Sequence, residues 1–74
     1  MTVIVTMEHI RAAKICSSGA RTFFNRHGID WTAFLNDGVP EEALLQTGDA
    51  QAARVVEIAR AEHERVEAER HGRQ

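Results

Sequence analysis

The chain has 74 residues, of which 43% are hydrophobic and 27% are charged, and its formal net charge is −2. This length allows one domain, and the single cysteine, Cys16, excludes an internal disulfide and is typical of a reducing, cytoplasmic compartment. The charge balance excludes a strongly basic nucleic-acid-binding protein, and the apolar stretch at residues 3–5 is too short to span a membrane or to form a signal peptide.

The first predicted element is an extended N-terminal arm at residues 1–5. Val3, Ile4 and Val5 are β-branched, which favours extended backbone. The sequence offers no obvious second strand for them. We therefore expect an apolar arm that packs on the helices, and the alternative is a strand that pairs with a second chain.

Two helices are predicted to follow, at the start of a single helical domain at residues 6–69. Thr6 can cap the first helix by accepting a backbone N–H, and this helix is expected to end near Ile15. Ser17 or Ser18 can cap the second helix in the same way.

Three glycines at intervals of ten residues are predicted to stop helices: Gly28, Gly38 and Gly48. Glycine lacks a Cβ atom, so it adopts the left-handed conformation that ends many helices. Each glycine is followed by a residue that favours a helix start: Asp30, Pro40 and Asp49. We predict two very short helices between the glycines, then a long charged helix from about residue 50 to Glu69 and a frayed tail at residues 70–74.

Together these elements predict an all-α fold, a small bundle of about five helices, two of them very short, with a long charged C-terminal helix. The predicted core consists of aromatic and aliphatic residues at helical spacing: Phe23, Phe24, Trp31, Phe34, Leu45 and Val56. An exposed aromatic patch that anchors a partner is the alternative interpretation of the aromatic residues.

The sequence contains no pattern typical of a catalytic, cofactor or metal site. Four residues separate Cys16 from Arg21, one fewer than in the phosphate-binding loop of cysteine phosphatases. We therefore expect a small, partly buried structural cysteine, with a reactive thiol as the alternative. Adjacent Glu41 and Glu42 point in different directions on a helix and cannot share one reacting centre. The four histidines lack metal-ligand spacing. We therefore predict no catalytic, cofactor-binding or metal-binding residue, no cofactor and no enzyme.

One interpretation of residues 20–36 is a helix–turn–helix motif with its turn at residues 28–30. In DNA-binding versions of this motif the second helix enters the major groove. That helix would be residues 31–36, which contain no lysine or arginine. Phosphate contacts need cations, so this arrangement argues against nucleic acid as a partner. A small helix–turn–helix-like DNA-binding regulator stays the alternative function.

The uneven distribution of charge points instead to protein contacts. Residues 1–27 carry four basic residues and one acidic residue, whereas residues 28–50 carry five acidic residues and no lysine or arginine. The candidate interaction residues come from the arm and the basic segment: Val3, Ile4, Val5, Arg21 and Arg26. The last helix adds a weak coiled-coil seam: Ala52, Val56, Ala59, His63 and Val66. We expect an unknown protein partner or weak self-association, and no contact with a membrane.

Residues 7–60 resemble small uncharacterised helical proteins encoded by phages and prophages of Gram-negative bacteria. The positions that carry the resemblance are Gly19-Ala20-Arg21, Phe24, His27-Gly28-Ile29-Asp30-Trp31, Phe34, Gly38-Val39, Leu45, Thr47-Gly48-Asp49-Ala50 and Val55-Val56. The resemblance implies a bacterial host cytoplasm and an assembly or accessory role, and it implies no catalytic residue. The sequence thus predicts a non-enzymatic protein-interaction module.

Overall fold

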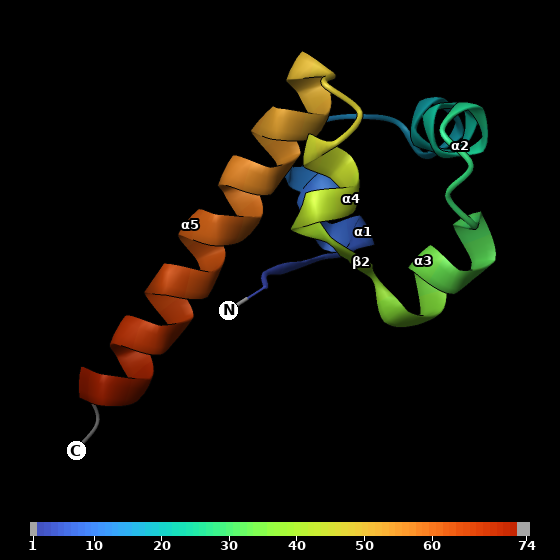
Figure 1. The fold of residues 1–74 in the computed structure, drawn as a ribbon. Helices are drawn as coiled ribbons and strands as arrows, with labels where there is room; N and C mark the ends of the chain where they lie inside the picture. The colour runs from blue at the N-terminus through green and yellow to red at the C-terminus, as the bar shows by residue number, and fades with distance from the viewer. Residues whose placement is uncertain (1, 73–74) are drawn as a thin grey trace.

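The computed structural model describes residues 2–72, which form five α-helices and one two-stranded sheet (Figure 1). The elements in chain order are β1 (Ile4–Val5), α1 (Met7–Ala12), α2 (Ser17–Arg26), α3 (Trp31–Asp37), β2 (Val39–Pro40), α4 (Glu41–Leu45) and α5 (Ala50–Gly72). The prediction of a mostly helical chain with five helices is confirmed. The all-α prediction holds approximately, because a small antiparallel sheet of two short strands accompanies the helices.

The N-terminal segment is a strand with a partner in its own chain. β1 pairs antiparallel with β2, with Ile4 opposite Pro40 and Val5 opposite Val39. Val5 is fully buried, so the described part of the predicted arm packs into the fold as a strand. The second strand has only two residues and ends in a proline, which the sequence analysis assigned to a helix start. Proline is tolerated at this strand end because an edge position needs no N–H donor.

The three glycines have positive φ values of 71°, 77° and 72°. After Gly28, the N–H of Ile29 donates to the carbonyl of Phe24 at 2.8 Å, the bond that closes a Schellman turn. α1 ends in the same way but without glycine. Lys14 has a φ of 61°, and the Ile15 N–H donates to the Ile10 carbonyl at 3.2 Å. This turn ends α1 at Ala12, earlier than the predicted Ile15.

The core is built around two aromatic rings that pack edge to face. Phe24 and Phe34 are each 2% exposed, and their ring centroids are 4.6 Å apart. Val56 is buried with them, while Phe23 and Trp31 are half-buried at the edge of the core. Aromatic pairs in this geometry are worth about 1 kcal/mol beyond their buried area.

The prediction that Leu45 belongs to the core is wrong. Leu45 is 41% exposed, whereas its neighbour Leu44 is 2% exposed. α4 spans only five residues, and adjacent residues on a helix point about 100° apart. Only one of the two leucines can therefore face α5.

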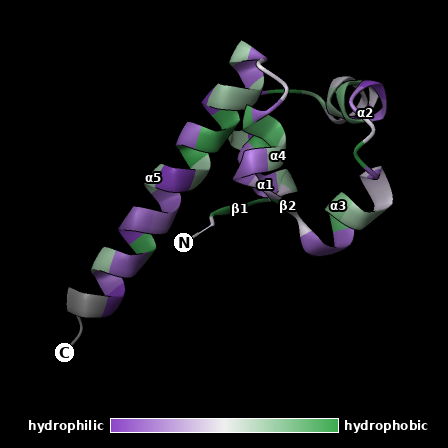
Figure 2. Ribbon diagram, viewed as in Figure 1, coloured by the Kyte–Doolittle hydropathy of each residue, from purple (hydrophilic) through white to green (hydrophobic). Residues whose placement is uncertain are grey.

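α5 is packed against the body along its first half only. In Figure 1 its C-terminal half projects past the other helices, and Figure 2 shows that the hydrophobic colouring of α5 gathers near the body. The sequence predicts a frayed tail at residues 70–74, but α5 continues as a helix to Gly72. Residues 73–74 lie outside the described range. Within that range, no helix is both long and apolar enough to cross a membrane.

Candidate functional site

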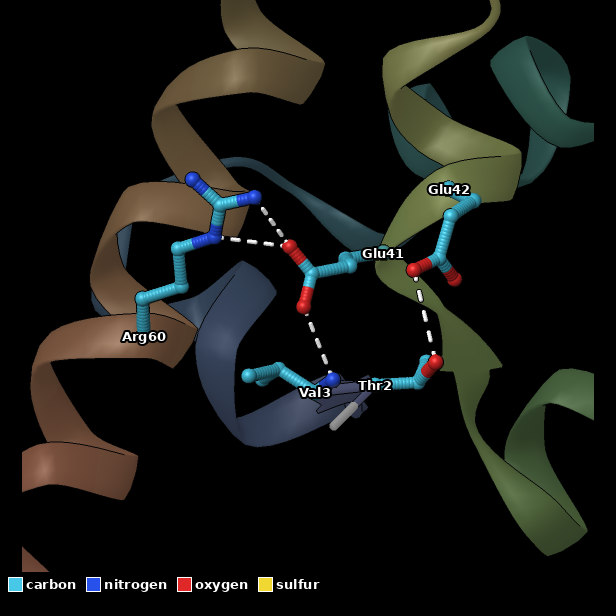
Figure 3. A network of polar contacts seen from close by, with 5 residues as sticks. All are labelled: Thr2, Val3, Glu41, Glu42 and Arg60. Atoms are coloured by element: carbon cyan, nitrogen blue, oxygen red, sulfur yellow. Dashed lines mark hydrogen bonds and ion pairs between the residues drawn. The ribbon is translucent and has the colours of Figure 1, made fainter.

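A buried carboxylate ties the N-terminal strand to α5. The Glu41 side chain is at the start of α4 and is 6% exposed. One of its oxygens accepts the Val3 backbone N–H at 2.8 Å, and the other accepts the Nε and Nη2 groups of Arg60 (Figure 3). The Glu41 backbone N–H donates in return to the Val3 carbonyl at 3.0 Å. Three segments far apart in the sequence therefore meet at one side chain.

The partners of Glu41 stabilise its charged form. The Val3 N–H, and then the Arg60 guanidinium, hold the pKa of Glu41 below its ordinary value. A carboxylate stabilised in its charged form is a poor proton donor. Neighbouring Glu42 points another way and accepts the Thr2 hydroxyl at 3.3 Å (Figure 3). The two acids do not share a centre, as the sequence analysis expected.

His9 forms a second buried polar link between α1 and α5. Its Nδ1 accepts the Thr6 backbone N–H at 2.9 Å, and its Nε2 lies 2.9 Å from Glu62 Oε1. A backbone N–H can only donate, so Nδ1 carries no proton and Nε2 donates to Glu62. Both ring nitrogens are thereby satisfied. This arrangement leaves no lone pair for a metal ion, and among the described residues no cluster of potential metal ligands occurs.

A groove of about 310 Å³ opens between the N-terminal strand and α5, next to the His9–Glu62 pair. It is lined by Thr2, Val3, Ile4, His9, Ala59, Glu62, His63 and Val66. Ile4 is 46% exposed and Val66 is 44% exposed, and they are two of the four large hydrophobic residues exposed in the described chain. The groove is therefore an apolar surface at the point where α5 leaves the body.

Cys16 caps α2, a role that the sequence analysis gave to Ser17 or Ser18. Its Sγ accepts the Gly19 N–H at 3.4 Å and lies 3.6 Å from the Ser18 hydroxyl oxygen. These contacts, that of Ser18 first, lower the pKa of the thiol. The thiol is exposed, so the expectation of a partly buried cysteine is wrong. No general base or second cysteine accompanies it within the described residues.

The five candidate interaction residues divide between two separate places. Val3, Ile4 and Val5 lie along the sheet, where Val5 is buried and Val3 is half-buried, so only Ile4 offers exposed apolar area. Arg21 and Arg26 are exposed on α2. α2 contacts α1 and α3, whereas β1 contacts β2 and α5. The structure therefore does not join the arm and the arginines into one surface.

The sequence analysis missed the polar links that organise the fold. From the sequence, Glu41 favours a helix start and Arg60 is expected to pair with Glu64 one turn further along the same helix, whereas in the structure Arg60 pairs with Glu41. The sequence predicts no role for Glu62. No local pattern indicates these pairs, because Glu41 meets Arg60 only once α4 has packed on α5, and His9 meets Glu62 across 53 residues.

Comparison of the chain with protein-family models, curated proteins and solved structures finds no match in any of the three.

Proposed function

We propose that the chain is a non-enzymatic protein-interaction module that self-associates weakly through the projecting half of α5. The observation that carries this proposal is that the apolar seam of α5 continues beyond the part that the body covers. Ala52, Val56 and Ala59 are at most 6% exposed, because the core uses them. His63 and Val66 continue the same face into the groove beside Ile4.

A second copy is the occupant that fits this surface best. In a two-fold contact each copy supplies the same patch, so Val66 of each copy can reach the groove of the other. The described end of α5 carries both signs of charge: Glu62, Glu64, Arg65, Glu67, Glu69 and Arg70. A segment with both signs can pair with a copy of itself. The opposite charges of residues 1–27 and 28–50 offer a second complementary contact between copies.

The exposed apolar area supports only weak association. Stable interfaces bury about 1,200–2,000 Å² in total, and here the exposed apolar anchors are confined to Ile4 and Val66, with Ala59 already in the core. Charge therefore contributes a large share, and association should weaken as salt screens it. The placement of this module in phage or prophage assembly, in a bacterial cytoplasm, rests on the sequence resemblance alone.

Sedimentation velocity on the wild-type chain and two matched variants tests the proposal. Val66→Glu places a charge in the groove, and Ala68→Glu adds the same charge on the opposite, exposed side of α5. We expect the weight-average sedimentation coefficient to rise with protein concentration for the wild type and for Ala68→Glu but not for Val66→Glu. A wild-type chain that is monomeric at every concentration and salt level contradicts the proposal, as does an equal response of the two variants.

A further inference from the structure

We propose that the chain binds duplex DNA through a helix–turn–helix made of α1, the turn at residues 13–16 and α2, with α2 as the helix that enters the major groove. Helix–turn–helix motifs join two helices by a turn of three or four residues, and the second helix reads the base edges. α1 ends at Ala12 and α2 begins at Ser17, so the spacing fits. Figure 1 views α2 along its axis while α3, α4 and α5 are seen from the side, so α2 is steeply inclined to these three helices.

The turn is held in a fixed geometry. Lys14 is the one non-glycine residue with positive φ in the described range. Its N–H donates to the Arg11 carbonyl at 2.9 Å, and Ile15 then folds back to pack against the core. The Arg54 guanidinium of α5 donates to the Ala13 carbonyl in the same turn. The left-handed conformation strains a residue that carries a β-carbon, and these contacts offset that strain and fix the direction of α2.

Apart from Gly19, the exposed residues of α2 are polar types that bind bases or phosphates in protein–DNA complexes. The inner side carries buried Ala20 and Phe24 and half-buried Phe23. Six exposed polar residues share the outer half of the helix: Ser17, Ser18, Arg21, Thr22, Asn25 and Arg26. Arginine pairs in bidentate fashion with guanine and asparagine with adenine in the major groove, and hydroxyl groups bind bases or phosphates. In the described chain neither arginine of α2 forms an ion pair.

The lysine and arginine residues of this region lie on α1, its turn and α2, and none lies on α3. Arg11 and Lys14 are exposed in α1 and its turn, ahead of the two arginines of α2. Two acidic residues lie nearby: Glu8 pairs with Arg11 at 3.4 Å, and Asp30 lines the same hollow as Arg21 and Asn25. α3 has no lysine or arginine, and its capping residue is Asp30. The sequence interpretation placed the motif at residues 20–36, with α3 as the second helix, whereas this proposal makes α2 the second helix. The lack of lysine and arginine in α3 therefore does not argue against DNA binding by α2.

The number of cations sets the strength and the salt dependence of binding. A protein that neutralises Z phosphates of duplex DNA loses affinity with a slope of about −0.9Z in a plot of log K against log salt. Four cations give a slope of about −3.6 for one copy. Because one copy carries the complete motif, this proposal does not depend on self-association.

Fluorescence anisotropy of the intact chain with a labelled mixed-sequence duplex tests the proposal. The titration is repeated between about 50 and 200 mM salt. The chain that carries both Arg21→Gln and Arg26→Gln should bind at least about tenfold more weakly, with a slope about two units shallower. The matched control carries Arg65→Gln and Arg70→Gln on α5, which removes the same charge from exposed positions elsewhere, and it should bind like the wild type.

Amide chemical shifts on addition of the same duplex provide the second readout, and they should change at residues 14–26 rather than along α5. Three results overturn the proposal: no binding at the lowest salt, an equal loss in the two double variants, or equally tight binding of double-stranded RNA of the same sequence. The last result counts because the major groove of RNA is too narrow to admit a helix.

Discussion

Gly38 differs from Gly28 and Gly48 in the atoms that surround it. A Cβ atom on Gly38 would lie 2.8 Å from the Val5 carbonyl oxygen, whereas Cβ atoms on the other two would meet nothing within 4 Å. All three substitutions to alanine incur the strain of positive φ, about 1 kcal/mol each. We predict that Gly38→Ala destabilises the fold by at least about twice that amount, because the strand must also shift. Urea unfolding of the three variants measures this, and equal losses of stability would contradict the close packing of β1 on Gly38.

The thiol of Cys16 should be more reactive than that of a free cysteine. Contacts with Ser18 and Gly19 lower its pKa, so a larger fraction is thiolate at neutral pH. The rate of alkylation should reach half of its maximum at a lower pH than for a cysteine peptide. Ser18→Ala should move this midpoint upward, and Thr22→Ala, on the same exposed face, should not. A wild-type midpoint equal to that of the peptide would show that the contacts do not stabilise the thiolate.

Glu41 should make stability depend on acidity. Its folded pKa is depressed, chiefly by the Val3 N–H and then by Arg60. The stabilisation is therefore present above the unfolded pKa of about 4.3 and is lost as the pH falls through the folded value. We predict that Glu41→Gln lowers the urea midpoint at pH 7 and that its difference from the wild type shrinks below about pH 4. Glu42→Gln is the control, and equal midpoints for both variants at pH 7 would remove the proposed role of Glu41.

At the scale of elements, α4 shows how a short helix selects its core residue. Leu44→Ala should cost about 2–5 kcal/mol because it leaves a cavity, whereas Leu45→Ala should cost less than about 1 kcal/mol at its exposed position. Phe34→Ala should cost about 3–5 kcal/mol, enough to unfold a domain this small. Thermal unfolding compares the three variants. A larger loss for Leu45→Ala than for Leu44→Ala would show that α4 is rotated relative to the structure.

The sequence could predict those helix ends at which a side chain caps the backbone of its own helix. Asp30 and Asp49 cap α3 and α5 by accepting N–H groups of Ala33 and Ala52, as their side chains predict. The end of α1 could have been found from Lys14-Ile15, because an apolar residue follows the turn there just as Ile29 follows Gly28. The pairing of β1 with β2 could not be found in this way, since two residues give no strand periodicity.

Over the whole molecule, the chain separates a packed body from two exposed surfaces, which are the polar side of α2 and the projecting half of α5. The body consists of the sheet, the first half of α5 and the helices that cover it, and it is fastened by Glu41 and His9. α2 presents its polar side on one part of the molecule, and the projecting half of α5 lies elsewhere (Figure 1). The sequence predicted both α2 and the seam of α5, but which of their residues stay exposed depends on how much of each helix the core covers. How much of each helix the core covers can be learned only from the three-dimensional packing.

Hydrogen–deuterium exchange at two protein concentrations tests most directly whether the projecting half of α5 is the contact element. At low concentration residues 63–70 should exchange quickly, because most of their side chains are exposed and this part of α5 projects past the other helices (Figure 1). At high concentration we predict slower exchange at these residues and unchanged exchange along α2. Exchange at residues 63–70 that is independent of concentration, or protection that arises at α2 instead, would contradict self-association through α5.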